Sequence, residues 1–132
     1  MIKKGIILSG GHGTRMSPLT KAVNKQLLPI YDKPLIYYSL SVLMLAKIKD
    51  ILIIVNKGQV NSYKKLLPNG KNLGIKIKYI EQSYPKGLPD AFILGKKFIA
   101  KNNVALILGD NFFYGNLLKA KLQKSSRLKN GA

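Results

Sequence analysis

The stretch KGIILSGGHGTR, residues 4–15, is a short apolar run that ends at three closely spaced glycines. Continuous apolar runs bounded by glycine are typical of strands that are buried on both faces of a parallel sheet. We therefore predict a buried strand over Lys4–Ser9 and a glycine-rich loop directly after it. Glycine has no Cβ and leaves the backbone N–H groups exposed, so a phosphate group can approach such a loop closely.

Similar apolar runs recur along the chain and alternate with segments of helical character. Further strands are predicted at 51–55, 75–82 and 104–110, and helices at 35–48, 59–67, 89–100 and 117–128. The strand at 75–82 alternates apolar and polar residues, which places it near an edge. Together the pattern predicts an α/β fold with a doubly wound, mostly parallel sheet and helices on both faces. The 132 residues suit one globular domain or part of one.

The chain is strongly basic, because 23 Lys and Arg residues face 5 Asp and Glu residues, for a formal net charge of +18. Such an excess of positive charge favours binding to nucleic acid, to an anionic membrane or to a phosphorylated small molecule. The lysines are spread from Lys3 to Lys129, so a solvated basic surface is an alternative explanation. The lack of cysteine excludes disulfides and thiolate metal sites. Because no apolar run is long enough for a bilayer and no secretory signal is recognisable, we expect a cytoplasmic location.

The predicted sheet brings three polar or glycine-rich segments to one edge. In open parallel sheets, ligands bind outside the carboxyl ends of the strands, where the strand order reverses. That rule selects Gly10–Arg15, Glu81–Gly87 and Gly109–Asn111. The first segment is neither a P-loop, which needs a Gly-Lys-Ser/Thr ending, nor a GxGxxG fingerprint, because Met16 stands where the last glycine belongs. It does offer Arg15, whose planar guanidinium fits two phosphate oxygens at once.

Longer motifs identify a family. GGHGTRMSPLT (residues 10–20) followed by NKQLLPIYDKPLIYY (residues 24–38) resembles the signature of the sugar-1-phosphate nucleotidylyltransferases, and the second segment is most similar to the members that use dTTP. EQSYPKGLPDAF (residues 81–92) resembles the nucleobase segment of that family, and LILGDNFFYG (residues 106–115) resembles its metal segment. The resemblance extends from Lys4 to Ala132. It implies the nucleotide-diphospho-sugar transferase fold, which is Rossmann-like.

The resemblance also implies the chemistry and the residues that perform it. A sugar phosphate oxygen attacks the α-phosphorus of a nucleoside triphosphate, and pyrophosphate leaves. The implied substrates are dTTP and glucose 1-phosphate, and the implied product is dTDP-glucose, a precursor of cell-surface polysaccharide. The matching catalytic positions are Arg15, Lys25 and Asp110, with Asp110 as the ligand of Mg²⁺. The matching nucleotide-binding positions are Leu8, Gly10, Gly11, Gly13, Thr14, Arg15, Lys25, Gln82 and Gly87.

Two of these positions have a clear chemical rationale. The carboxamide of Gln82 offers a donor beside an acceptor, which matches the imide edge of thymine or uracil but not cytosine. It cannot detect the methyl group that distinguishes thymine from uracil. Asp110 ends the most apolar predicted strand, where one carboxylate together with phosphate oxygens suits a single Mg²⁺.

Several departures from the family pattern leave alternatives open. Ser9 replaces the usual alanine, Met16 the usual leucine, and Pro89-Asp90 stand where thymidylyltransferases often carry Ala-Gln. The family extends beyond a length of 132 residues, so we expect residues 1–132 to form a nucleotide-binding N-terminal part. The C-terminal sugar-binding part, with a catalytic lysine and a second metal-binding aspartate, is then absent. Little activity is expected from this chain alone, and the family implies a homo-oligomer. The alternatives are a UTP-using uridylyltransferase and a non-catalytic basic module that binds nucleotide or nucleic acid, although nucleic acid is the weaker expectation.

Overall fold

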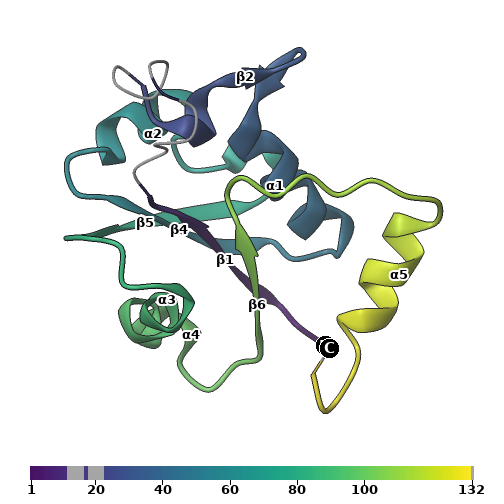
Figure 1. The fold of residues 1–132 in the computed structure, drawn as a ribbon. Coiled ribbons are helices and arrows are strands. Elements are labelled where there is room, and N and C mark those ends of the chain that lie inside the picture. Colours follow the sequence, from purple (N-terminus) through teal and green to yellow (C-terminus); the bar gives the residue numbers. More distant parts are fainter. Residues whose placement is uncertain (12–16, 18–22, 132) are drawn as a thin grey trace.

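A computed structural model describes residues 1–11, 17 and 23–131 of the chain (Figure 1). Its centre is a sheet of four parallel strands, β1 (Lys4–Ser9), β4 (Asp50–Asn56), β5 (Lys76–Gln82) and β6 (Val104–Leu108). Their order across the sheet is β5-β4-β1-β6. The chain therefore starts in the interior of the sheet, builds outward in one direction, and returns to the other side of β1. That reversal between β1 and β6 is a topological switch point.

The central strands are buried because their sequences are apolar on both faces. In β1 and β4, Ile6, Ile7 and Ile53 are fully buried. The register pairs Leu8 with Ile54 on one side and with Leu108 on the other, so the carboxyl ends of three strands are level. The predicted parallel sheet and its buried strands are confirmed.

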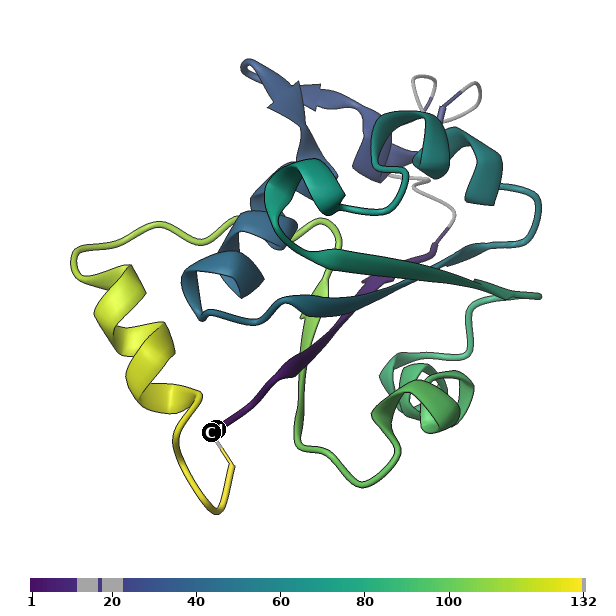
Figure 2. The same cartoon turned by 180° about the vertical axis from the view of Figure 1, so that it is seen from behind.

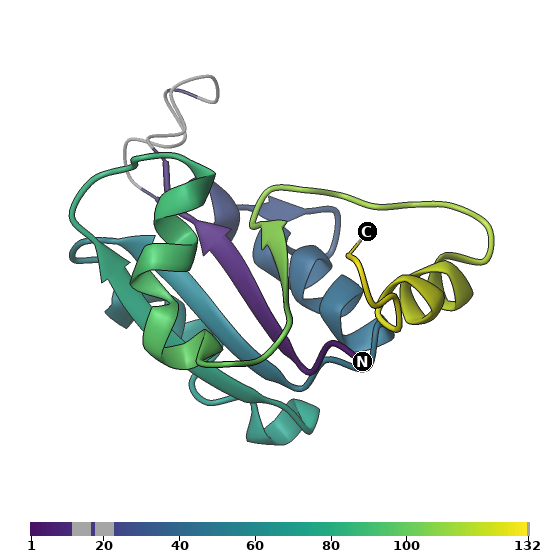
Figure 3. The same ribbon diagram turned by 90° about the horizontal axis from the view of Figure 1, so that it is seen from below.

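Helices cover both faces of the sheet (Figures 2 and 3). On one face lie α1 (Leu35–Leu45), α2 (Val60–Leu66) and the 3-10 turn η4 (Lys71–Leu73), with α5 (Leu118–Ser125) beside α1. On the other face α3 (Leu88–Leu94) and α4 (Lys96–Ile99) pack through Ala91 and Phe98. Two separate apolar clusters result, one on each side of the sheet. The doubly wound arrangement predicted from the sequence is confirmed.

The predicted helices differ from the observed ones in their limits: the helix expected at 59–67 covers Val60–Leu66, and the helix expected at 117–128 covers Leu118–Ser125. The helix expected at 35–48 ends at Leu45, and Lys47 has a φ of 64°. The helix expected at 89–100 is divided into α3 and α4 at Gly95. A Cβ at Gly95 would lie 2.9 Å from the carbonyl oxygen of Ala91 and 3.0 Å from Cδ1 of Ile6. Glycine therefore allows this helical segment to pack close to β1.

A small hairpin and a 3-10 turn precede α1 and are not foreseen in the sequence pattern. The 3-10 turn η3 covers Lys25–Leu27, and the hairpin pairs β2 (Pro29–Ile30) with β3 (Lys33–Pro34). The hydroxyl of Tyr38 donates a 2.7 Å hydrogen bond to the carbonyl of Ile30, which holds the hairpin against α1. Asp32 lies in the turn between the two strands.

In the part of the chain that the structure describes, none of the helices has the length and apolar character needed to span a bilayer.

Candidate active site

The candidate site is built on the carboxyl edge of the sheet. Gly10 and Gly11 follow β1, Asn56 ends β4, Gln82 ends β5, and Asp110 lies two residues beyond β6. The register between β4 and β5 pairs Asn56 with Gln82 directly. The structure thus brings together the three segments that the sequence selected, as far as their residues are described.

Gln82 lies against the backbone of the glycine segment. Its Nε2 atom donates a 3.0 Å hydrogen bond to Oδ1 of Asn56, and its side chain is buried, with an exposed fraction of 3%. A Cβ on Gly10 would lie only 1.6 Å from Nε2 of Gln82. Position 10 therefore has to be glycine for this carboxamide to occupy its place.

Asn56 connects the amide of Gln82 to the glycine segment. Its Nδ2 atom donates a 2.9 Å hydrogen bond to the carbonyl of Gly11, and its Oδ1 atom accepts a 3.3 Å bond from the N–H of the same residue. Because Oδ1 accepts from both Gly11 and Gln82, the orientation of each amide is fixed. Asn56 is a site residue that the sequence analysis missed. Its polar side chain at the end of the buried run ILIIV was the available signal.

Lys25 and Asp110 form an ion pair across the edge. The Lys25 Nζ atom lies 2.6 Å from Oδ2 of Asp110, and about a third of each side chain is exposed (28% and 32%). Lys25 begins η3, whereas Asp110 follows β6, so the pair joins segments 85 residues apart. A cation and a carboxylate in contact and open to solvent can separate to meet a charged ligand of either sign.

The position of Asp110 is set by close packing below it. Gly109 donates a 2.9 Å backbone hydrogen bond to Leu8, which extends the pairing of β6 with β1 by one residue. A Cβ on Gly109 would lie 2.7 Å from Oγ of Ser9, so a larger residue would push the turn outward. From α1 the buried Ser39 donates to the carbonyl of Leu108 at 2.9 Å. Ser39 was also missed, because α1 contains two serines, Ser39 and Ser41, and nothing in the sequence shows which of them contacts the site.

The residues fit a Mg²⁺ ion held jointly with a ligand. Among residues 1–11, 17 and 23–131, no group of three or more His, Cys, Asp or Glu residues could form a metal cage. Mg²⁺ commonly uses only one or two carboxylates and takes its other ligands from phosphates and water. Asp110 can supply one carboxylate once Lys25 moves away, so the donor set suits a metal that arrives with a nucleotide.

Other predicted site residues are placed as follows. Leu8 is half-buried in β1 and accepts the hydrogen bond from Gly109. Gly87 is exposed and precedes α3 with a φ of 89°, a conformation that favours glycine. Gly13, Thr14 and Arg15 lie outside the described residues.

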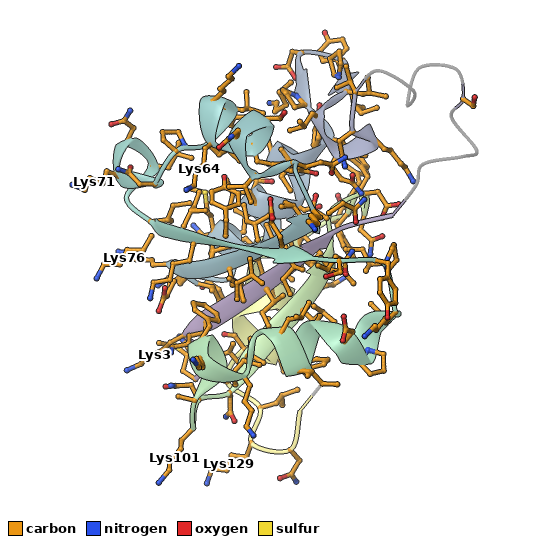
Figure 4. All side chains as sticks on the ribbon, turned by 90° about the vertical axis from the view of Figure 1, so that its left-hand side faces the viewer. Lys3, Lys64, Lys71, Lys76, Lys101 and Lys129 are labelled. Carbon is orange, nitrogen blue, oxygen red and sulfur yellow. The ribbon has the colours of Figure 1, made fainter. Side chains whose placement is uncertain are left out.

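Lysines dominate the opposite end of the sheet. An open cavity of about 850 Å³ at the amino ends of the strands is bordered by Lys3, Lys47, Lys49, Lys71, Lys76 and Lys78. Figure 4 shows that Lys3, Lys71 and Lys76 extend outward into solvent from three different segments of the chain. The position rule for parallel sheets places ligands at the carboxyl edge, so the candidate site is the edge with Lys25 and Asp110.

Replacing Gly10 with alanine tests the packing of Gln82. We expect Gly10→Ala to lower the free energy of unfolding by about 1–3 kcal/mol, because the new Cβ overlaps the Gln82 amide and forces it or the backbone to move. Gly115→Ala is the control, since nothing lies within 4 Å of a Cβ there. Chemical denaturation measures both variants, and equal stability of the two would contradict the observed packing.

The fold belongs to the doubly wound α/β class, with a glycine-rich segment, a buried amide and a lysine–carboxylate pair at its carboxyl edge. A model of the nucleotidyl transferase family matches residues 4–131, and the chain belongs to that family.

Curated relatives share the sequence at high identity. Glucose-1-phosphate thymidylyltransferase from Neisseria meningitidis is 54% identical over 129 residues, and the enzyme of that name from Mycolicibacterium smegmatis is 47% identical over 129 residues. Each alignment covers 98% of this chain but 45% of the relative. The chain therefore spans about half the length of the curated relatives it matches.

Solved structures agree with the fold. A Bacillus anthracis protein assigned to the glucose-1-phosphate thymidylyltransferases, in complex with a sucrose, is similar with a TM-score of 0.86 and 34% identity, over 96% of this chain and 51% of that chain. A UDP-glucose pyrophosphorylase complexed with UDP-glucose is similar with a TM-score of 0.77 and 28% identity, over 96% of this chain and 52% of that chain. The expected family and fold are confirmed.

Proposed function

We propose that this protein is the nucleotide-binding part of a nucleotidyltransferase that transfers a thymidylyl group from dTTP to glucose 1-phosphate. The products are dTDP-glucose and pyrophosphate, and we expect the reaction to occur in the cytoplasm. The proposal is supported by the identities of 54% and 47% to glucose-1-phosphate thymidylyltransferases. The structural observation that carries it is the ion pair of Lys25 with Asp110 at the switch point of the sheet.

The ion pair suggests how the charges of Lys25 and Asp110 are compensated when no ligand is bound. Without a ligand, Lys25 and Asp110 satisfy each other at 2.6 Å. On binding of a triphosphate with Mg²⁺, Lys25 would move to the phosphate oxygens as a point charge, and Asp110 would become a metal ligand. The metal, when bound, neutralises developing charge on the phosphates. Arg15, by its match to the family motif, would stabilise the leaving pyrophosphate. This division of charge is typical of phosphoryl transfer, in which positioning and electrostatics do most of the work.

Gln82 is proposed to select the base. One of the two N–H groups of the Gln82 Nε2 atom donates to Asn56, and this bond fixes the orientation of the carboxamide. The second hydrogen of Nε2 and the Oε1 atom would pair with the imide edge of thymine. Because only 3% of Gln82 is exposed, the residues that cover it have to move aside when the base binds.

Base selection gives a direct test. We expect dTTP or UTP with Mg²⁺ to bind more tightly than CTP, because cytosine offers the reverse donor and acceptor pattern at the paired edge. The discrimination should be about tenfold to a hundredfold, the usual value of one or two hydrogen bonds. Isothermal titration calorimetry measures the affinities. Gln82→Ala should remove the difference between the bases.

The same experiment separates the remaining candidates. Preference for UTP over dTTP would favour the uridylyltransferase alternative, which is supported by the 28% identity to a UDP-glucose pyrophosphorylase. Equal affinity for all bases, lost at moderate salt, would indicate general attraction to the net charge of +18 and overturn the proposal.

A further inference from the structure

A buried tyrosine lies directly behind the candidate site and has no role in the proposed chemistry. Tyr63 of α2 is fully buried, and its Oη atom lies 2.8 Å from Oγ of Ser9 and 2.8 Å from Oδ1 of Asn24. Ser9 is the last residue of β1, and Asn24 directly precedes η3. One hydroxyl group therefore joins the strand that leads into Gly10 to the turn that carries Lys25.

The direction of each hydrogen bond follows from the surroundings of Asn24. Its Oδ1 accepts from the N–H of Gln26 at 2.9 Å, and its Nδ2 donates to Oε1 of Gln59 at 2.5 Å. The amide oxygen therefore faces Tyr63 and can only accept. The single phenolic proton of Tyr63 is donated to Asn24, so the hydroxyl of Ser9 must be the donor to Tyr63.

The hydroxyl of Ser9 determines which way the hydrogen bonds between Ser9, Tyr63 and Asn24 run. The carbonyl of Ser9 lies 3.3 Å from Oη of Tyr63 and is a competing acceptor for the phenolic proton. With the Ser9 hydroxyl donating from one side, the proton is directed to Asn24. A residue without a hydroxyl group at position 9 could not supply that donor.

Asn24 links the hydrogen bond from Tyr63 to the position of Lys25. As the residue that caps η3, Asn24 fixes where the turn begins, because its side chain accepts the N–H of Gln26, the second residue of the turn. Lys25 is the first residue of η3, and its Nζ reaches Asp110 at 2.6 Å. A shift of Asn24 would move the backbone from which Lys25 extends.

We propose that Tyr63 is a positioning residue that, through Asn24, directs Lys25 toward Asp110 and toward the phosphates of the bound nucleotide. The part that concerns the nucleotide rests on the proposed function, whereas the part that concerns Asp110 does not. Burial raises the pKa of Tyr63 above its ordinary value near 10, so the phenol keeps its proton throughout the physiological range. The hydrogen bond from Tyr63 to Asn24 therefore does not change with pH in that range.

The first experiment needs no nucleotide. In ¹⁵N-labelled protein, the ammonium group of Lys25 should give an NMR signal that is protected from exchange by its bond to Asp110, and Asp110→Asn identifies that signal by removing it. We expect Tyr63→Phe to broaden or abolish the signal. Tyr79→Phe is the matched control, because it removes a half-buried phenolic hydroxyl that donates a 2.5 Å hydrogen bond to the carbonyl of Leu67 rather than to a site residue. Loss of the signal in neither or in both variants would overturn the inference.

The second experiment measures affinity for dTTP with Mg²⁺. Tyr63→Phe should weaken binding about fivefold to tenfold, the usual value of one lost hydrogen bond, while Tyr79→Phe changes it less than about twofold. In a Lys25→Ala background, Tyr63→Phe should have almost no further effect, because its action passes through Lys25. Additive losses would instead show a general structural role and contradict the inference.

The two experiments distinguish two kinds of failure. If the unmodified protein binds no triphosphate, the proposed function fails, yet the Lys25 ammonium signal still decides whether Tyr63 positions that lysine. If triphosphate binds but Tyr63→Phe leaves both the signal and the affinity unchanged, the proposed function survives and the positioning role is wrong.

Discussion

Lys25→Ala weakens the binding of dTTP with Mg²⁺ by about tenfold to a hundredfold, whereas Lys101→Ala weakens it by less than about twofold. Each substitution removes one positive charge from a chain of formal net charge +18. The difference arises from location, because Lys25 lies at the carboxyl edge 2.6 Å from Asp110 and Lys101 is exposed in the loop before β6 (Figure 4). A charged hydrogen bond at a partly desolvated site is worth about 1.5–3 kcal/mol, whereas a solvated lysine contributes only screened attraction.

Calorimetry at two salt concentrations tests this prediction by measuring the affinity of each variant for dTTP with Mg²⁺. The loss caused by Lys25→Ala should persist at higher salt, because a short contact is screened less than long-range attraction. Asp110 is left without its cation in this variant, so the binding of Mg²⁺ alone should be measured as well. Equal losses for the two lysine variants, both removed by salt, would favour the basic binding module over a defined phosphate site.

The sequence allowed the sheet to be predicted well because its central strands β1 and β4 are apolar on both faces. The run at 4–9 has no polar face, so only a central position in a covered parallel sheet suits it, and β1 lies there. The division of α3 from α4 was not foreseen. Gly95 has an ordinary helical conformation, and its role becomes clear only when Ile6 packs against it. Close tertiary packing of this kind leaves no local signal in the sequence.

The site was predicted less completely, for a similar reason. Motif resemblance located Lys25 and Asp110, and the structure brings them into contact. The residues that support the site, Asn56, Ser39 and Tyr63, come from several elements and form their hydrogen bonds only after the sheet is assembled. A single amide or hydroxyl group in an apolar run does not indicate its partner. The roles of the predicted site residues in catalysis remain predictions, including those of Gly13, Thr14 and Arg15.

The largest expected effect concerns turnover. The chain alone should form little or no dTDP-glucose, because it spans 45% of the Neisseria meningitidis relative and the family resemblance assigns sugar binding to the remaining part. Holding two reactants in the correct geometry lowers the activation barrier by about 7–11 kcal/mol. Loss of that positioning therefore reduces the rate by many orders of magnitude. Fusion of the chain to the part of that relative beyond the matched region should restore activity, measured as pyrophosphate release that depends on glucose 1-phosphate.

Within that active fusion, Asp110→Asn should lower kcat by about 10³-fold or more, because a metal that stabilises the transferring phosphate contributes several kcal/mol. Asp32→Asn is the matched control, since Asp32 also pairs with a lysine, Lys33 at 3.4 Å, but on an exposed turn. We expect it to leave kcat unchanged within about twofold, because exposed ion pairs contribute little. Full turnover by the 132-residue chain at a rate unaffected by Asp110→Asn would contradict both the need for a sugar-binding part and the assignment of Asp110 to the metal.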